Sequence, residues 1–247
     1  MKEENNKKTK NNIVRKLFKL IGFLAFLVGT VAISTVFLTG IHLDNETITN
    51  IINKIAEFMD NIRLLDIFRE HLGIFMIIYY SGFFLIIWGS GKTIIGRFLV
   101  TIALGIFALT ANFFAFRQDT MFLLSYPKMG ISNFNYGETI TNIFIKILST
   151  DTAKGVLPQL LFAGCNLFFI LLFAFKKPKR LYSILLSSAF CMDILIIGIF
   201  LVLQLFSISI SMDTAKTISY IVIGIYAVKY ALQILGSIFG ALFFFRK

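Results

Sequence analysis

The stretch Leu181–Phe206, LYSILLSSAFCMDILIIGIFLVLQLF, decides the fold class of this chain, and Asp193 is its single charged residue. A helix needs roughly 17–25 mainly apolar residues to cross the hydrocarbon of a bilayer, about 30 Å thick. Strands that cross a membrane alternate polar and apolar residues, and this stretch does not alternate. It therefore predicts a transmembrane helix.

Five other runs have the same character, and the composition of the chain agrees with them. Of the 247 residues, 57% are hydrophobic and 15% are charged, whereas a soluble domain is about one quarter charged. The fold class expected is an all-α, polytopic membrane helix bundle of six transmembrane helices. The predicted spans are Leu20–Leu38, Gly73–Trp88, Phe98–Phe116, Leu157–Phe175, Leu181–Phe206 and Thr217–Phe245.

The distribution of basic residues predicts the orientation, because Lys and Arg in short segments are retained on the cytoplasmic side. The tail 1–19, the loops that follow the second and fourth spans and the chain end hold 15 of the 24 basic residues, but only Glu3 and Glu4 of the 13 acidic ones. We therefore expect three out-and-back hairpins with both termini in the cytoplasm. We interpret the chain as a multi-pass protein of the cell membrane, in a bacterial cytoplasmic membrane.

The net charge of +11 could also suggest binding to nucleic acid or to a nucleotide, and the sequence disfavours both. No loop interleaves aromatic and basic residues as single-strand binders do, so nucleic acid is not an expected partner. Gly91-Lys92-Thr93 imitates the end of a phosphate-binding loop, but Ile86 stands where that motif needs glycine, and nucleotide binding is rejected. The charge instead marks topology and attraction to anionic lipid headgroups.

Two outer segments nearly repeat each other: Glu46–Ile55 and Glu138–Ile147 differ at two positions. A shorter echo joins Asp151–Lys154 to Asp213–Lys216. Triplication of a hairpin would explain both, and so would the general features of good helix starts. Within the outer segment 46–68, apolar residues recur at helical spacing, which predicts an amphipathic helix on the outer membrane surface or over the bundle. The segment 117–156 is the expected second outer loop.

One part of the chain resembles a known family. Phe37-Leu38-Thr39-Gly40-Ile41-His42, then Gly82-Phe83-Phe84-Leu85-Ile86-Ile87-Trp88-Gly89, and then Arg97 are similar in arrangement to DoxX-like membrane proteins. The resemblance covers about residues 37–116. It departs from the family pattern at Tyr80 and Ser81, where an acidic residue is usual, and in the number of spans. That family includes membrane subunits of redox complexes, and this role is not carried over.

Charged side chains in the middle of a span are costly, and they mark functional or structural sites. Asp193 lies midway along the fifth predicted span and Lys229 midway along the sixth. Because these spans are consecutive and antiparallel, we predict an Asp193–Lys229 ion pair. It would be either a static clamp between helices or a group that responds during transport.

The sixth span also carries a packing face. Gln233, Gly236 and Gly240 share one side of the helix with Lys229, and Gly-x-x-x-Gly lets another helix approach closely. This face is therefore a predicted helix-packing interface. Asn112 and Asn166 add polar side chains inside the third and fourth spans, where hydrogen bonding between helices is expected, with a substrate contact as the alternative.

The remaining reactive side chains give no catalytic or metal-binding pattern. Cys165 and Cys191 lack the Cys-x-x-Cys spacing of thiol oxidoreductases, so we expect small buried hydrophobes. His42 and His71 have no ligand at diagnostic spacing, so neither a metal nor another cofactor is expected. No nucleophile and base are paired, which disfavours an enzyme.

Two functions follow as hypotheses. The first is a non-catalytic integral membrane subunit or accessory protein, which acts through helix–helix and outer-loop contacts with other membrane proteins. The alternative is a small permease or channel-like carrier that uses the Asp193–Lys229 pair. Only two charged residues lie in the middle of the six predicted spans, which is few for a pathway that binds and moves a substrate. This favours the first hypothesis.

Overall fold

The computed structural model describes residues 2–39, 46–61, 63–89, 94–116, 152–176, 180–205 and 211–245, with some side chains near helix ends excepted. Every regular element in these ranges is an α-helix, which confirms the predicted all-α class. The helices are α1 (Lys2–Thr39), α2 (Glu46–Asn61), α3 (Leu64–Glu70), α4 (Leu72–Trp88), α5 (Ile94–Phe116), α8 (Thr152–Lys176), α9 (Leu181–Leu205) and α10 (Met212–Phe245).

Within the described residues, three helices are long and apolar enough to cross a membrane: Ile13–Thr39 in α1, Leu181–Leu203 in α9 and Asp213–Phe245 in α10. These correspond to the first, fifth and sixth predicted spans and indicate a membrane protein. The bent pair Leu64–Glu70 and Leu72–Trp88 would add a fourth if it forms one span. The described apolar parts of α5 and α8 are shorter, at Ile95–Ile106 and Ala163–Phe173. The full number of six spans therefore stays a prediction.

The second predicted span, Gly73–Trp88, corresponds to α4, which starts one residue earlier at Leu72. Its 17 residues rise only about 25 Å, less than a typical hydrocarbon layer. Helix α3 precedes it at an angle of 83°. At the corner, the His71 N–H donates to the Ile67 carbonyl at 3.1 Å, and the His71 carbonyl accepts from the Ile74 N–H at 2.9 Å, so the break keeps its backbone groups hydrogen-bonded.

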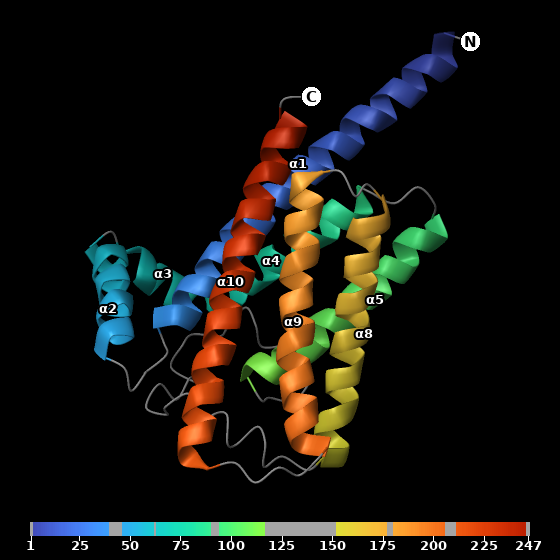
Figure 1. Cartoon of the computed structure of the whole chain (residues 1–247). Helices are drawn as coiled ribbons and strands as arrows, with labels where there is room; N and C mark the ends of the chain where they lie inside the picture. Colours follow the sequence, from blue (N-terminus) through green and yellow to red (C-terminus); the bar gives the residue numbers. More distant parts are fainter. Residues whose placement is uncertain are drawn as a thin grey trace.

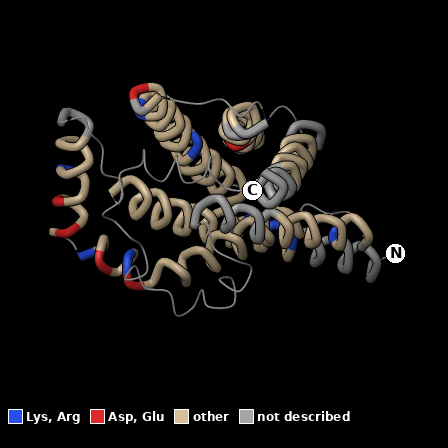
Figure 2. Tube along the Cα trace, turned by 90° about the horizontal axis from the view of Figure 1, so that it is seen from below, with Lys and Arg blue, Asp and Glu red and all other residues tan. Residues whose placement is uncertain are grey.

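The sequence predicts one amphipathic helix over the outer segment 46–68. The structure instead has two helices there, α2 and α3. Arg63 has the left-handed backbone angle φ of 53°, which ends α2 and turns the chain into α3. Figure 1 shows α2 beside α1 and α3 and away from the ends of α8, α9 and α10, so it does not roof the bundle. Its apolar residues Ile51, Ile55 and Phe58 are exposed. Figure 2 shows the charged residues of α2 and α3 gathered at this side of the molecule.

The helices α8, α9 and α10 lie side by side, and α1 crosses them obliquely (Figure 1). Helix α1 packs mainly on α4 and α10, α9 packs between α8 and α10, and α5 contacts α8 and α4. The start of α1 and the end of α10 lie at the same end of the bundle (Figure 1).

Among the described residues, aromatic rings from several helices form the largest buried cluster. Phe83 of α4 lies at its centre and has no exposed surface. The centroid of its ring lies 5.5 Å from that of Phe26 in α1, 4.8 Å from that of Phe169 in α8 and 5.3 Å from that of Phe190 in α9. The core therefore joins helices from both halves of the sequence.

Helices α1 and α4 approach each other closely at glycines whose packing role the sequence did not predict. A Cβ atom added to Gly22 would lie 2.8 Å from the carbonyl oxygen of Gly82, and one added to Gly29 would lie 2.6 Å from the Cβ of Tyr79. Close approach of backbones at small residues is a main source of stability between helices in membranes.

Candidate functional site

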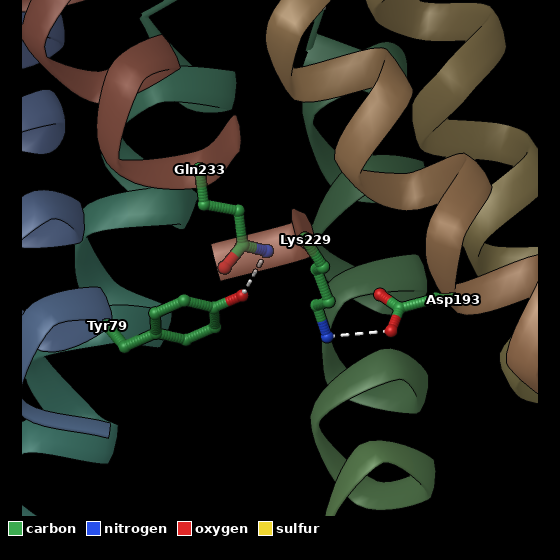
Figure 3. Close-up of polar contacts among 4 residues, drawn as sticks. All are labelled: Tyr79, Asp193, Lys229 and Gln233. Atoms are coloured by element: carbon green, nitrogen blue, oxygen red, sulfur yellow. Dashed lines mark hydrogen bonds and ion pairs between the residues drawn. The ribbon is translucent and has the colours of Figure 1, made fainter. Parts of the chain in front are cut away.

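The predicted pair Asp193 and Lys229 lie together in the structure. Lys229 Nζ donates to Asp193 Oδ1 at 2.6 Å, and the two side chains are 10% and 2% exposed, Lys229 being the first. Figure 3 shows the pair between the two helices. Asp193 is at the midpoint of α9 and Lys229 is close to the midpoint of α10. Because the carboxylate and the ammonium are both buried, each needs the other to offset its lost hydration.

A second polar contact lies one helical turn away on α10. Gln233 Nε2 donates to the hydroxyl oxygen of Tyr79 in α4 at 3.1 Å (Figure 3). Gln233 has no exposed surface and Tyr79 is 7% exposed. Lys229 and Gln233 are four residues apart and therefore face the same side of α10. Together they bind α10 to α9 and to α4, and we call Tyr79, Asp193, Lys229 and Gln233 the polar centre.

Tyr79 is a site residue that the sequence analysis missed. The available signal was a phenol hydroxyl inside an apolar run, because a buried tyrosine hydroxyl usually finds a hydrogen-bond partner. Such a signal does not identify the partner, since Gln233 is 154 positions further along the chain. Only the packing of α4 on the rest of the bundle brings the two side chains together.

Two aromatic rings of α10 lie near the cation of the polar centre. Lys229 Nζ lies 5.4 Å from the ring centroid of Tyr226 and 5.5 Å from that of Tyr230. A cation over an aromatic face is attracted by the electron density of the ring, more strongly where water is excluded. The Tyr226 ring also lies 5.0 Å from that of Phe37, so this part of α10 packs on α1 as well.

Two oxygen atoms of the polar centre accept no hydrogen bond from the described residues. They are Asp193 Oδ2 and Gln233 Oε1, and both are buried. A carboxylate oxygen and an amide oxygen are both acceptors, so each of these two atoms keeps an unused acceptor position. Elsewhere in the described residues, no three His, Cys, Asp or Glu side chains gather as metal ligands.

Other helices of the same chain pack against the predicted packing face of α10. A Cβ atom added to Gly236 would lie 3.0 Å from the Leu186 side chain of α9. At Gly240 the ring of Phe23 in α1 occupies the space that a side chain would need. Ser237 on the same stretch donates to the Gln233 carbonyl at 2.6 Å. The face of Gln233, Gly236 and Gly240 therefore packs against α1, α4 and α9.

The structure describes some of the other predicted residues and leaves others out. Asn166 of α8 is fully buried, and the side chain of Asn112 lies outside the described residues, as does His42. Cys165 is buried as expected, but the expectation for Cys191 is wrong, because its thiol is on an exposed side of α9. The repeat-like segment Glu138–Ile147 and most of the outer loop 117–156 also lie outside the described residues.

Comparison with known proteins finds no matching family model, no matching characterised relative and no matching solved structure. The resemblance to DoxX-like proteins is therefore tested by none of these comparisons and stays a prediction.

Proposed function

We propose that this chain is a non-catalytic subunit or accessory protein of a bacterial cytoplasmic membrane, with six spans and both termini in the cytoplasm. Its polar centre is a static clamp that holds α4, α9 and α10 in one arrangement. Contacts with other membrane proteins are made by the outer segments, where the apolar face of α2 is exposed.

The orientation is supported by basic residues at one end of the bundle. The Arg97 guanidinium lies 5.2 Å from the ring of Trp88, at the end of α4. The Lys19 ammonium lies 5.0 Å from the ring of Phe244, at the end of α10. Arg180 directly precedes α9. These residues come from segments that the positive-inside rule assigns to the cytoplasm.

One observation carries the clamp: Lys229 and Gln233, two polar side chains of one α10 face, bind residues of other helices in the same chain. Lys229 binds α9 and Gln233 binds α4. Leu186 and Phe23 occupy the space beside the glycines that follow, Gly236 and Gly240. This face is used for intramolecular packing, which leaves the outer segments as the place for partner contacts.

A double-mutant cycle tests the clamp. Asp193→Asn and Lys229→Met are made singly and together in the full chain, with Val228→Met as the matched control, because Val228 is the exposed neighbour of Lys229. Each single change leaves one buried charge without its partner and should cost about 3–5 kcal/mol of stability. The double variant should recover most of the folded yield in detergent. Additive losses would contradict the clamp.

A small carrier is the alternative, and the two unpartnered oxygens, Asp193 Oδ2 and Gln233 Oε1, favour it. A carrier needs polar groups that are free to bind a substrate or a proton for part of its cycle. Proton transport is measured with purified protein in liposomes that contain a pH-sensitive dye, under an imposed membrane potential. A proton flux in the wild type that a folded Asp193→Asn/Lys229→Met variant lacks would favour the carrier over the clamp.

A further inference from the structure

Four aromatic rings from three helices meet where α9 begins and α10 ends. Phe23 of α1 lies 5.3 Å from Tyr182 of α9 and 5.9 Å from Phe244 of α10, between ring centroids. Tyr182 lies 5.8 Å from Phe243, and Phe243 lies 5.0 Å from Phe244. We call these four rings the aromatic platform. Phe23 reaches it because Gly240 leaves room for its ring.

Two cations lie on adjoining rings of the aromatic platform. Lys19 Nζ is 5.0 Å from the centroid of Phe244, and Arg180 Cζ is 4.1 Å from the centroid of Phe243. Arg180 also donates through Nη1 to the Tyr182 hydroxyl at 3.2 Å. Both side chains are half-buried. The stacking fixes their positions in advance, so that less conformational entropy is lost when a ligand binds them.

We propose that the aromatic platform binds the phosphate of an anionic phospholipid through Lys19 and Arg180. The rings of Phe243 and Phe244 that carry the two cations have centroids 5.0 Å apart, so both cations belong to one end of α10. The guanidinium has five N–H donors and can grip a phosphate with two of them, while an ammonium adds a point charge. The proposal rests on the orientation given above, which places this end in the headgroup layer of the cytoplasmic leaflet.

A lipid fits this place better than free phosphate because apolar surface continues beside the cations. Leu242 is 47% exposed and Phe245 is 77% exposed, both in the last turn of α10. Aromatic side chains gather at the level of lipid headgroups, and the acyl chains of a bound lipid would cover these residues. A free phosphate would use the two cations and leave the apolar surface in water.

Native mass spectrometry of the full chain in detergent, titrated with phosphatidylglycerol, tests the proposal. Arg180→Gln and Lys19→Gln are compared with the wild type and with Lys54→Gln, which removes an exposed lysine of α2. A hydrogen bond to a charged group corresponds to about a tenfold change in affinity. We expect each of the two platform variants to bind phosphatidylglycerol about tenfold more weakly and Lys54→Gln to bind like the wild type.

Several outcomes would overturn the proposal. One is equal binding of phosphatidylcholine and phosphatidylglycerol, and another is the same loss in all three variants. Displacement of the lipid by millimolar inorganic phosphate, together with binding of phosphate alone, would assign the site to free phosphate. The Arg180→Lys variant keeps the charge and should retain part of the affinity. It therefore shows whether the loss in Arg180→Gln comes from the missing charge or from misfolding.

The lipid site and the proposed function can fail separately. The double-mutant cycle at Asp193 and Lys229 reports on the clamp and does not involve the platform. If position 180 proved to face the outside while the platform still bound phosphatidylglycerol selectively, the orientation would be wrong and the lipid site would stand in the other leaflet.

Discussion

Gly29 of α1 lies directly against the backbone of Tyr79 in α4: a Cβ atom added at Gly29 would be 2.7 Å from the Cα of Tyr79. This contact fixes the place of Tyr79, whose hydroxyl in turn accepts a hydrogen bond from Gln233 of α10. A glycine in the first span therefore positions a group of the polar centre.

Gly29→Ala should destabilise the protein. The added methyl group has backbone and Cβ atoms of Tyr79 in its way, which cannot rotate aside as the end of a flexible side chain could. Overpacking of this kind costs about 1–3 kcal/mol. The free energy of unfolding, measured by titration of the detergent-solubilised protein with SDS, should fall by this amount.

Gly224→Ala in α10 is the matched control for that substitution. A Cβ atom added there meets nothing within 4 Å, and alanine is favoured over glycine in a helix by up to about 1 kcal/mol. Its stability should stay the same or rise slightly. Equal losses in the two variants would mean that the close contact of α1 and α4 is not what limits stability.

The hydrogen bond between Tyr79 and Gln233 should behave as a coupled pair. Tyr79→Phe leaves the buried Gln233 amide without its acceptor and should cost about 1–3 kcal/mol. Adding Gln233→Leu removes the orphaned amide, so the double variant should be more stable than the Tyr79→Phe variant. Tyr220→Phe, at a half-buried tyrosine of the same helix α10, is the control. Coupling is read from the four unfolding curves of the cycle.

The parts of the site that the sequence predicted are those marked by a rare residue type. Asp193 and Lys229 stood out because charges are costly in an apolar run, and the consecutive antiparallel helices gave them similar depth. Gly236 and Gly240 were marked by their spacing. In both cases a local pattern in one or two neighbouring helices was enough.

The rest depended on contacts between distant segments or on backbone angles without a sequence signal. Gly22 and Gly82 meet across α1 and α4, and nothing in either run specifies the other. The end of α2 depends on a left-handed backbone angle at Arg63, where glycine or asparagine would have been the expected signal. The apolar residues keep their helical spacing from α2 into α3, so the sequence did not predict the break between the two helices.

The two cysteines should differ in their reaction with lipid-soluble maleimides. Cys191 is on an exposed side of α9, whereas Cys165 is 7% exposed within the aromatic core. A pyrene maleimide added to the folded protein in detergent should label Cys191 much faster, and SDS should abolish the difference. Labelling of Cys191→Ser and Cys165→Ser variants assigns the two rates. Equal rates before denaturation would contradict the packing of α8 and α9.

The orientation of the first hairpin predicts which positions react from outside the cell. In a background without the native cysteines, single cysteines replace Val14 near the start of the first span and Asn53 on α2, both exposed. A membrane-impermeant maleimide should label position 53 in intact cells, because the positive-inside rule places α2 outside. Position 14 should react only after the membrane is permeabilised. Reaction of position 14 in intact cells, with position 53 protected, would reverse the orientation and move the aromatic platform to the outer leaflet.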